Sequence, residues 1–377
     1  MASDGRAVGR EGSGGRVVFL DGALPGDRVR ARIIEERPRY VGGEVVELIE
    51  PSADRVDARC GHVEEKCGGC QWQHANPEAQ RSYKSQIILD AFRRIGRMEP
   101  PPLQPTVELA VWGYRTTLRA GVASDGRAGL RSLRSNDVVP VPDCLVIHPL
   151  LTELLADGRY PGADEVILRC GARTGERLVA TVPSGSEPDV PADVARSHFR
   201  EEAAGRTWRI SARSFFQTRP DGVDALAALV VAAADELSSP ARALDLYSGV
   251  GLFAGVLAGR GWSVTAVEGA AASVADARHN LRDLDVRIVR ADVTRWRPTQ
   301  AELVVADPSR VGLGRSGVEA VADSGASRLI LVSCDSGSLG RDAGLLGDAG
   351  YHATSVTPVD LFPHTFHVEV VTVFDRA

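Results

Sequence analysis

Hydrophobic and polar residues alternate over short distances near the start of the chain. Apolar residues recur at or near every second position in the runs 16–20, 28–34 and 43–49, and turns rich in glycine and proline, such as 22–27, separate them. Short runs of this kind, bounded by turn residues, are typical of antiparallel strands. The pattern predicts a small OB-like β-barrel at the N-terminus, a type of domain that binds single-stranded nucleic acid through basic and aromatic residues.

The C-terminal half has a different pattern, in which short apolar runs alternate with helical stretches. Predicted strands lie at 242–247, 263–268, 286–289, 303–306, 328–332 and 368–374, after an Ala- and Leu-rich helix at 221–237. Strands that alternate with helices form parallel sheets covered by helices on both faces. We therefore expect an α/β fold with a Rossmann-like, doubly wound sheet.

The middle of the chain combines a cysteine-rich segment, one helix and short β-like runs. The helix is predicted over 77–98, and its apolar stripe consists of Ile87, Ile88, Ala91, Phe92 and Ile95. The β-like runs 115–123, 165–170 and 177–182 predict a small, mainly antiparallel module. The expected domains are 1–57 (barrel), 58–200 (cysteine-rich and central α+β) and 201–377 (Rossmann-like), with the helix packing on the last.

The composition indicates where the protein is found but does not identify its binding partner. The 377 residues carry a net charge of −6, and no apolar stretch approaches the roughly 20 residues that span a bilayer. We expect a soluble, cytoplasmic monomer that does not insert into membranes. The net negative charge argues at first sight against a polyanionic partner. Lys66 and Lys84 are the only lysines, but a genome-wide composition bias would also produce this arginine excess.

Four of the six cysteines are placed to share one site. Cys60, Cys67 and Cys70 are clustered, and Cys144 lies in a turn-like segment that could supply a fourth thiolate. Disulfides are not expected in a cytoplasmic protein. Four thiolates hold either structural zinc or an iron–sulfur cluster. The single Cys-x-x-Cys pair favours a cluster, because zinc ribbons usually have two such pairs.

A glycine-containing turn marks the candidate cofactor site. Gly249 and Gly251 follow the strand 242–247, and Glu268 ends the next strand, where a carboxylate can bind ribose hydroxyls. Asp292 ends a third strand and is placed to contact an adenine. Ala254 occupies the third glycine position of a dinucleotide motif, and nothing is placed to hold a pyrophosphate. S-adenosyl-L-methionine therefore fits better than a nicotinamide or flavin cofactor.

Two further strand ends carry candidate chemistry. Asp307 and Arg310 follow the strand 303–306, where Asp307 can orient a base and Arg310 can hold a phosphate, unless they form only a cap or an ion pair. Cys334 ends the next apolar run and opens a polar turn, a position that suits a nucleophile. The alternative for Cys334 is a half-buried core residue, as in an amino-group methyltransferase. Glu369 is the candidate base.

These motifs resemble the S-adenosylmethionine-dependent RNA uracil-C5 methyltransferases almost from end to end. The likeness rests on Val332-Ser333-Cys334-Asp335 with Leu339-Gly340-Arg341-Asp342, Asp307-Pro308-Ser309-Arg310, Ser214-Phe215-Phe216-Gln217 and Phe366-His367-Val368-Glu369-Val370-Val371. The resemblance implies a class I methyltransferase domain. It also implies Cys334 as the nucleophile that adds to uracil C6, and Glu369 as the base. The positions that contact the methyl donor in the family are Gln217, Tyr247, Glu268 and Asp307.

The resemblance also implies a branch of the family. Residues 1–57 resemble the RNA-binding TRAM module, and Cys60, Cys67, Cys70 and Cys144 match the ligands of a 4Fe–4S cluster. The branch with both features resembles enzymes that act on 23S ribosomal RNA. Two alternatives stay open, namely a transfer RNA uracil-C5 methyltransferase and a catalytically inactive RNA-binding protein. The chain departs from the family pattern at the six-residue Cys60–Cys67 gap, at Asp335-Ser336 and at Ser309.

Overall fold

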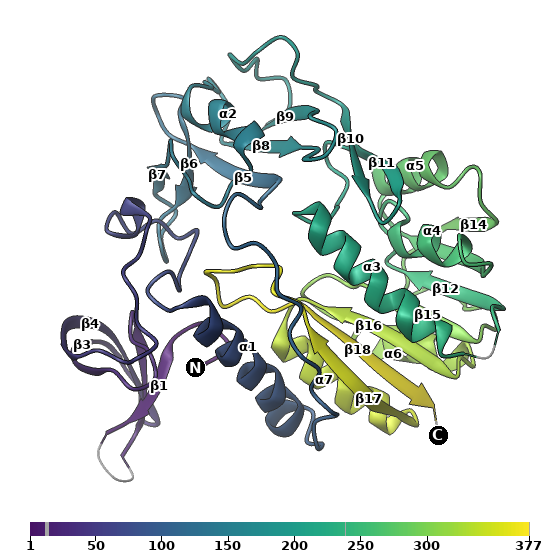
Figure 1. Ribbon diagram of the computed structural model, residues 1–377, viewed down its shortest axis with the longest axis horizontal. Coiled ribbons are helices and arrows are strands. Elements are labelled where there is room, and N and C mark those ends of the chain that lie inside the picture. Colours follow the sequence, from purple (N-terminus) through teal and green to yellow (C-terminus); the bar gives the residue numbers. More distant parts are fainter. Residues whose placement is uncertain (12–14, 238, 377) are drawn as a thin grey trace.

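The computed structural model describes residues 1–11, 15–237 and 239–376, which form an N-terminal sheet, a central sheet and a large C-terminal sheet (Figure 1). The N-terminal sheet has the strand order β1-β2-β4-β3. Its strands are β1 (Ala7–Arg10), β2 (Val17–Asp21), β3 (Arg28–Glu36) and β4 (Tyr40–Glu50). The pair β2–β4 is parallel, and β1 and β3 are edge strands, so the described residues form an open sheet and not the hydrogen-bonded barrel that the sequence predicts.

The cysteine-rich segment leads through the short helix η1 (Gly61–Val63) into helix α1 (Pro77–Asp90). Asn76 caps α1, because its side chain accepts a hydrogen bond from the Ala79 amide at 2.8 Å. The helix continues as a π-helical turn, η2 (Ala91–Ile95), which shifts the apolar stripe. Phe92 is fully buried, but Ile95 is 49% exposed, so the sequence prediction was wrong for Ile95.

The central sheet has the order β7-β6-β5-β8-β9. Its strands are β5 (Thr117–Val122), β6 (Ala128–Arg131), β7 (Val138–Pro140), β8 (Glu165–Cys170) and β9 (Arg177–Val182), accompanied by η3 (Pro149–Leu151) and α2 (Thr152–Ala156). Alternate residues of β5 and β8, such as Leu118 and Leu168, are buried in a core on one face. A two-stranded hairpin, β10 (His198–Ala203) and β11 (Arg206–Ser211), connects this region to the C-terminal one.

The C-terminal sheet has seven strands in the order β14-β13-β12-β15-β16-β18-β17. Its strands are β12 (Arg242–Leu246), β13 (Ser263–Glu268), β14 (Val286–Arg290), β15 (Leu303–Ala306), β16 (Arg328–Ser333), β17 (Tyr351–Pro358) and β18 (Val370–Arg376). Its helices are α3 (Pro220–Asp235), α4 (Leu252–Ala258), α5 (Ala271–Asn280), α6 (Gly314–Asp323) and α7 (Ser336–Asp348). The strand order reverses between β12 and β15, which creates the crevice where ligands bind in such sheets.

The C-terminal sheet is mixed and not purely parallel as the sequence pattern predicts. Strand β18 lies between β16 and β17 and is antiparallel to both. It begins at Val370, two residues later than predicted, and the pattern did not reveal β17 at all. The segment 359–369 between β17 and β18 contains no crossover helix, as a parallel pair would usually need, so these two strands pair antiparallel. Glu369 therefore lies in the loop just before β18 and not within the strand.

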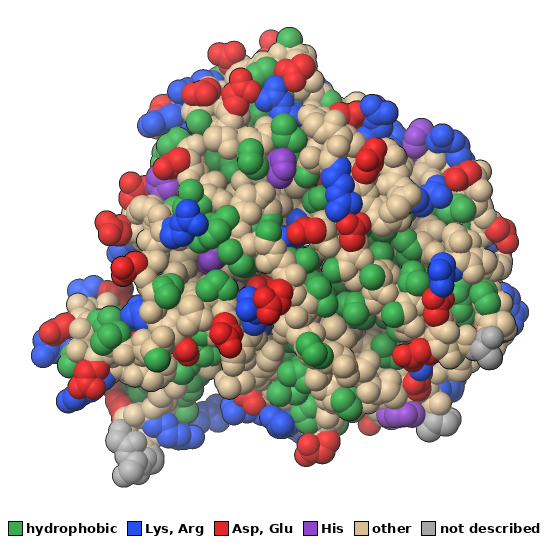
Figure 2. All heavy atoms as spheres, in the orientation of Figure 1, with side chains coloured by type: hydrophobic (Ala, Val, Ile, Leu, Met, Phe, Trp, Pro, Cys, Tyr) green, Lys and Arg blue, Asp and Glu red, His purple; other side chains and the backbone are tan. Residues whose placement is uncertain are grey.

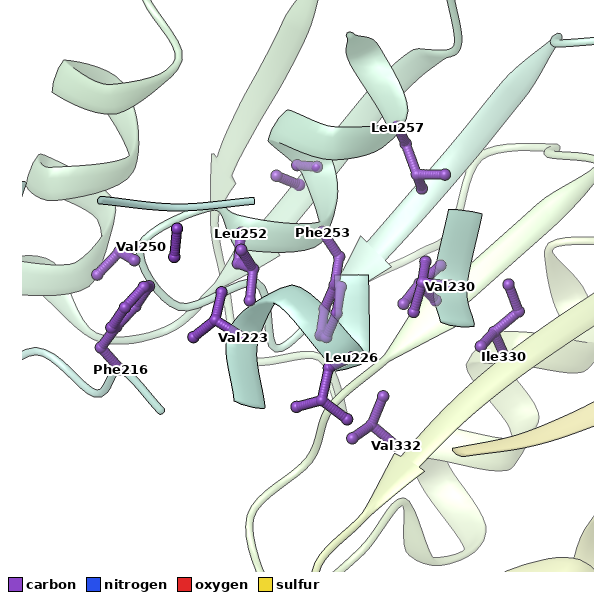
Figure 3. Packing of buried hydrophobic residues seen from close by; sticks show 14 of the residues in the cluster. Phe216, Val223, Leu226, Val230, Val250, Leu252, Phe253, Leu257, Ile330 and Val332 are labelled. Atoms are coloured by element: carbon purple, nitrogen blue, oxygen red, sulfur yellow. The ribbon is translucent and has the colours of Figure 1, made fainter. Parts of the chain in front are cut away.

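Side chains from both sides of the sheet fix its strands in place. Phe253 of α4 and Leu226 and Val230 of α3 pack toward Ile330 and Val332 of β16 (Figure 3). The opposite face packs against α6 and α7, and Phe92 of η2 belongs to this second cluster. None of the helices described is both long and apolar enough to cross a membrane.

Candidate active site

The carboxyl ends of four neighbouring strands carry the candidate site residues. Tyr247 follows β12, Glu268 ends β13, Asp307 follows β15 and Cys334 follows β16. The register places these ends side by side, since the last residue of β12 pairs with residues at the ends of β13 and β15. The sheet therefore brings the predicted donor-binding and nucleophile positions to one edge.

The turn after β12 is shaped by positive φ angles and by two acidic side chains. Gly249 and Gly251 have φ of 55° and 93°, and Tyr247 has a φ of 61°, which is strained for a residue with a Cβ. The Gly249 amide donates to Glu268 Oε2 at 2.9 Å. Asp245, within β12, accepts from the Ala254 amide at 2.8 Å. These contacts hold the turn open toward the edge of the sheet.

Asp245 is a functional candidate that the sequence reasoning missed. It is fully buried, and burial raises the pKa of its carboxyl to about 8, with smaller contributions from Asp307 and Glu268. Among the described residues, neither Asp245 Oδ1 nor the buried Ser248 hydroxyl has a hydrogen-bond partner. Unsatisfied buried polar atoms are expected where a polar ligand binds. The signal was present in the sequence, as a single acidic residue within an apolar strand.

The stability of the protein should depend on the ionisation of Asp245. Its folded-state pKa is about 8 against an ordinary value of 3.8, so its contribution to stability is present below about pH 4 and is lost as the pH rises to about 8. Replacing it by the neutral Asp245→Asn should raise the free energy of unfolding at pH 8 by about 1–3 kcal/mol. Urea denaturation at pH 5 and pH 8 measures this. An equal effect of the substitution at both pH values would contradict the prediction.

Asp307 and Gln217 form one contact near the centre of the edge. Gln217 is buried, and its Nε2 donates to Asp307 Oδ2 at 3.3 Å. Burial raises the pKa of Asp307 to about 7, although the Gln217 contact lowers it. Two other residues that the sequence predicts to contact ligands are exposed to solvent. Arg310 is exposed, and Asp292 is an exposed residue that accepts from the Thr294 amide at 2.9 Å.

Cys334 and Glu369 lie at the same end of the antiparallel pair β16–β18. The last pair of the ladder is Ser333 with Val370, and Cys334 and Glu369 are the residues next to it in the chain. They are close enough for the charge of Glu369 to act on the Cys334 thiol. Glu369 is 2% exposed, and its Oε1 has no partner among the described residues. Burial, and then the charge of Asp307, raises the pKa of Glu369 well above its usual range. The carboxyl is therefore buried without a fixed partner, beside a thiol.

The ionisation of Cys334 depends on the charges around it. Burial, followed by the carboxylates of Glu369 and Asp307, raises the pKa of the thiol to about 12, whereas Arg310 lowers it. The turn after the thiol is well defined despite its unusual sequence. Asp335 caps α7, because its Oδ1 accepts from the Ser338 amide at 2.7 Å. The positive end of the α7 dipole therefore lies next to Cys334.

The four predicted ligand cysteines line one small pocket. These residues, Cys60, Cys67, Cys70 and Cys144, surround a cavity of about 20 Å³. Burial raises the pKa of Cys70 to about 12, and its contact with Gln73 lowers it. Over 1–11, 15–237 and 239–376, no three His, Cys, Asp or Glu side chains are grouped closely enough to hold a single metal ion.

A cleft that contains three arginines lies near the candidate site. Arg115, Arg119 and Arg131 line it together with His367, two residues before Glu369. Glu165 also lines it and forms ion pairs with Arg119 and Arg131. The neighbouring depression contains Phe215, whose side chain is 63% exposed. Elsewhere on the face seen in Figure 2, acidic and basic side chains are intermixed. Local arginines and an exposed aromatic therefore provide a surface suited to nucleic acid, although the net charge is negative.

The chain is similar to known proteins along its whole length. Residues 2–46 match the TRAM domain family. The chain is 36% identical over its full length to an uncharacterized RNA methyltransferase of Streptomyces avermitilis, of which 96% is covered. It is 34% identical over its full length to the 23S rRNA (uracil(1939)-C(5))-methyltransferase of Methylococcus capsulatus, of which 95% is covered.

A solved structure has the same fold along nearly the whole chain. This is the tRNA (uracil-54, C5)-methyltransferase of Pyrococcus abyssi in complex with S-adenosyl-L-homocysteine, with a TM-score of 0.73 and 22% identity. The match covers 98% of this chain and 100% of that one, and it confirms the predicted class I methyltransferase fold. Together with the sequence relatives, these findings show that the chain belongs to the family of S-adenosylmethionine-dependent RNA (uracil-C5) methyltransferases.

Proposed function

We propose that this enzyme methylates C5 of a uridine in 23S ribosomal RNA through a covalent bond between Cys334 and C6 of the base. The observation that carries the proposal is that Cys334 and Glu369 both adjoin the last pair of the β16–β18 ladder, near enough for the charge of Glu369 to act on the thiol. A nucleophile and a base are both needed, because uracil C5 is too weakly nucleophilic to be methylated directly. Neither residue would have to lie near the other if the protein only bound RNA.

In the proposed reaction Cys334 adds to the base and later leaves it, and Glu369 removes one proton. S-adenosylmethionine supplies the methyl group as a sulfonium. The Cys334 thiolate adds to C6, and the displaced electron pair makes C5 nucleophilic, so C5 takes the methyl group as the methyl–sulfur bond breaks. Glu369 then removes the C5 proton, and the electrons of that bond restore the C5–C6 double bond and expel the thiolate.

The charges at the site explain why the thiol would react only in the assembled complex. In the free protein, Glu369 and Asp307 disfavour the thiolate of Cys334, and burial disfavours it most. A sulfonium bound at the edge of the sheet adds a positive charge that opposes this effect. Arg310 and the start of α7 act in the same sense. Formation of the nucleophile would then be coupled to binding of the methyl donor.

The residues around the glycine turn suit the methyl donor. We assign its binding to Gln217, Tyr247, Gly249, Gly251, Glu268, Asp292 and Asp307. The unpartnered Asp245 Oδ1 and Ser248 hydroxyl support a polar ligand at this edge. The arrangement offers carboxylates for ribose hydroxyls and for a cation. No described side chain in this set is a cation that would bind a pyrophosphate.

Ribosomal RNA is the favoured substrate, because the Methylococcus relative at 34% identity is named for 23S rRNA. The Pyrococcus enzyme of similar fold is named for tRNA, and transfer RNA is therefore the second candidate. In either case the target uridine would have to leave its stack, which costs a few kcal/mol. Contacts with Arg310, the arginine-lined cleft and the N-terminal sheet would offset this cost. The proposed division into domains 1–57, 58–200 and 201–377 assigns RNA binding mainly to the first two.

RNA that contains 5-fluorouridine tests the covalent mechanism. The fluorine at C5 cannot leave as a proton does, so the complex should persist as a denaturant-resistant protein–RNA adduct that forms only with S-adenosylmethionine. Methyl transfer to ordinary RNA without such an adduct would rule out the Cys334 mechanism. RNA binding with neither transfer nor adduct would favour a catalytically inactive RNA-binding protein. Incubation with separate ribosomal and transfer RNA would distinguish the two substrates.

We further propose that the cysteine pocket holds an iron–sulfur cluster, of the 4Fe–4S kind. Four thiols converge on one pocket, and they are not close enough together for a single metal ion. A cluster binds each thiolate through a different iron, so its ligands lie farther apart than the ligands of one zinc ion. The proposed reaction transfers no electrons, and the cluster would therefore stabilise the fold.

Removal of one ligand should destabilise the cysteine-rich segment. Anaerobically purified Cys70→Ser is expected to contain less iron and sulfide and to unfold at a lower temperature, by several degrees. Metal analysis and thermal denaturation measure both. Cys170→Ser is the matched control, because Cys170 lies in the central sheet outside the pocket. Stoichiometric zinc with no iron in the wild-type protein would contradict the cluster assignment.

A further inference from the structure

Glu369 lies at the end of a loop whose contacts come largely from the N-terminal half of the chain. This loop, residues 359–369, connects β17 to β18 and is called the base loop below. In Figure 1 it extends from the C-terminal sheet toward α1. The loop closes on itself, because the Val359 amide donates to the carbonyl oxygen of Glu369 at 2.8 Å. Any contact that fixes this closure also fixes the backbone of Glu369.

Lys84 of α1 holds the base loop beside its closure. Its Nζ donates to Asp360 Oδ1 and to the Phe362 carbonyl oxygen, both at 2.8 Å. Lys84 is 4% exposed and Asp360 is 1% exposed. Asp360 directly follows Val359, so the ion pair acts one residue from the hydrogen bond to Glu369. Of the two lysines in the chain, this one is buried within the fold.

Gln80, one turn earlier on α1, holds the middle of the base loop at His364. Its Oε1 accepts from the His364 amide at 2.7 Å, and its Nε2 lies 3.3 Å from His364 Nδ1. The same Nε2 donates to the carbonyl oxygens of Trp72 and Ala75 at 3.0 and 2.8 Å, so Gln80 ties the loop to the segment that precedes α1. The Trp72 amide donates to the His364 carbonyl oxygen at 2.9 Å, and the Trp112 ring stacks on the imidazole. His364 has a φ of 65°, an unfavourable conformation for a residue with a Cβ. These outside contacts hold the strained residue in place.

The chemistry of these contacts points to positioning and not to stability alone. A buried ion pair such as Lys84–Asp360 is no more stabilising than well-packed apolar side chains, because both charges must be desolvated. It does, however, define one geometry between the elements it joins. The position of Glu369 has to be fixed by its surroundings, because its Oε1 has no hydrogen-bond partner among the described residues.

We propose that Lys84 and Gln80 are positioning residues for Glu369. Lys84 fixes the base loop at Asp360, and Gln80 fixes it at His364. The Glu369 carboxyl is thereby directed at the C5 proton of the methylated base. The proposal rests on the role assigned above to Glu369. It assigns helix α1, far from Glu369 in sequence, to the proton-removal step and not to RNA binding.

A trapped intermediate tests the proposal. In Gln80→Met, which conserves volume and adds no charge, proton removal should be slowed about a hundredfold. Methylated RNA should then accumulate as a covalent adduct with Cys334 on ordinary uridine, while KM for RNA and for the methyl donor stays within about twofold. The double variant Lys84→Met/Asp360→Asn should behave in the same way. Tyr83→Phe is the matched control, because it removes one hydrogen bond of α1 that goes to Asp54 and not to the base loop.

The outcomes separate this proposal from the proposed function. A general loss of stability would lower the rates of adduct formation and breakdown together, without trapping, and would overturn the positioning role. Failure of both variants to fold would also contradict it, because these side chains would then serve the core. Adduct trapping in Glu369→Gln but not in the α1 variants would refute only the positioning role. No methyl transfer by the wild-type protein would refute the proposed function itself.

Discussion

Replacing Cys334 by alanine is expected to abolish methyl transfer, with a loss of about four to six orders of magnitude in turnover. The reason is chemical, since without a thiolate at C6 the C5 carbon does not become a nucleophile. The 5-fluorouridine adduct should disappear completely. Binding of RNA and of S-adenosylmethionine should change little, because Cys334 forms no hydrogen bond within the described structure. Methyl incorporation and equilibrium binding, measured on the same preparation, give both quantities.

The matched control for this substitution is Cys170→Ala. Cys170 is also a cysteine near the end of a strand, but it is buried in the central sheet away from the candidate site. It should cost some stability through the small cavity it leaves, and it should leave adduct formation intact. Substantial methylation by Cys334→Ala would exclude the covalent route and favour direct transfer, as in amino-group methyltransferases.

Substituting Glu369 by glutamine should separate the two halves of the reaction. Glutamine conserves shape but cannot accept the C5 proton, so steady-state turnover should fall by about 10²–10⁴-fold. The first methyl transfer should persist, and methylated RNA should remain attached to Cys334. Protein denaturation followed by gel electrophoresis detects this adduct on RNA without fluorine.

The same variant should be at least as stable as the wild-type protein at pH 8. The folded-state pKa of Glu369 lies well above its usual range, so its contribution to stability is lost as the pH rises toward that pKa. Glutamine does not ionise and removes this penalty. Glu201→Gln, which is equally buried but lies on β10, is the control and should retain normal turnover. Normal turnover in Glu369→Gln would show that another group removes the proton.

The strand pattern was sufficient to predict which residues meet at the sheet edge. Tyr247, Glu268, Asp307 and Cys334 each stand at the end of an apolar run, and parallel strands bring such ends together. The predicted bounds of β8, β9, β13 and β15 agree with the structure. The local sequence pattern is sufficient for these residues, because each one lies at the edge of the sheet simply by following its own strand.

Features that depend on distant segments could not be predicted in this way. Cys334 and Glu369 come to the same end of the sheet because β18 is inserted beside β16, and no local period in the sequence encodes that choice. The exposure of Ile95 results from one π-helical turn, which rotates the end of the helix away from the core. The edges of the N-terminal sheet likewise depend on long-range pairing. The roles of Cys334 and Glu369 were indicated by family resemblance, and they stay predictions until they are tested.

The ion pair between Lys84 and Asp360 also has a consequence for biosynthesis. Ribosomes make proteins from the N-terminus, so α1 emerges long before the carboxylate that neutralises its buried lysine. Until then the nascent chain cannot bury this face of α1 without an unpaired charge. Its final packing must wait for the last part of translation. A chain that terminates before residue 360 would lack both Glu369 and the partner of Lys84, so we expect such fragments to be degraded and not to act as partly active methyltransferases.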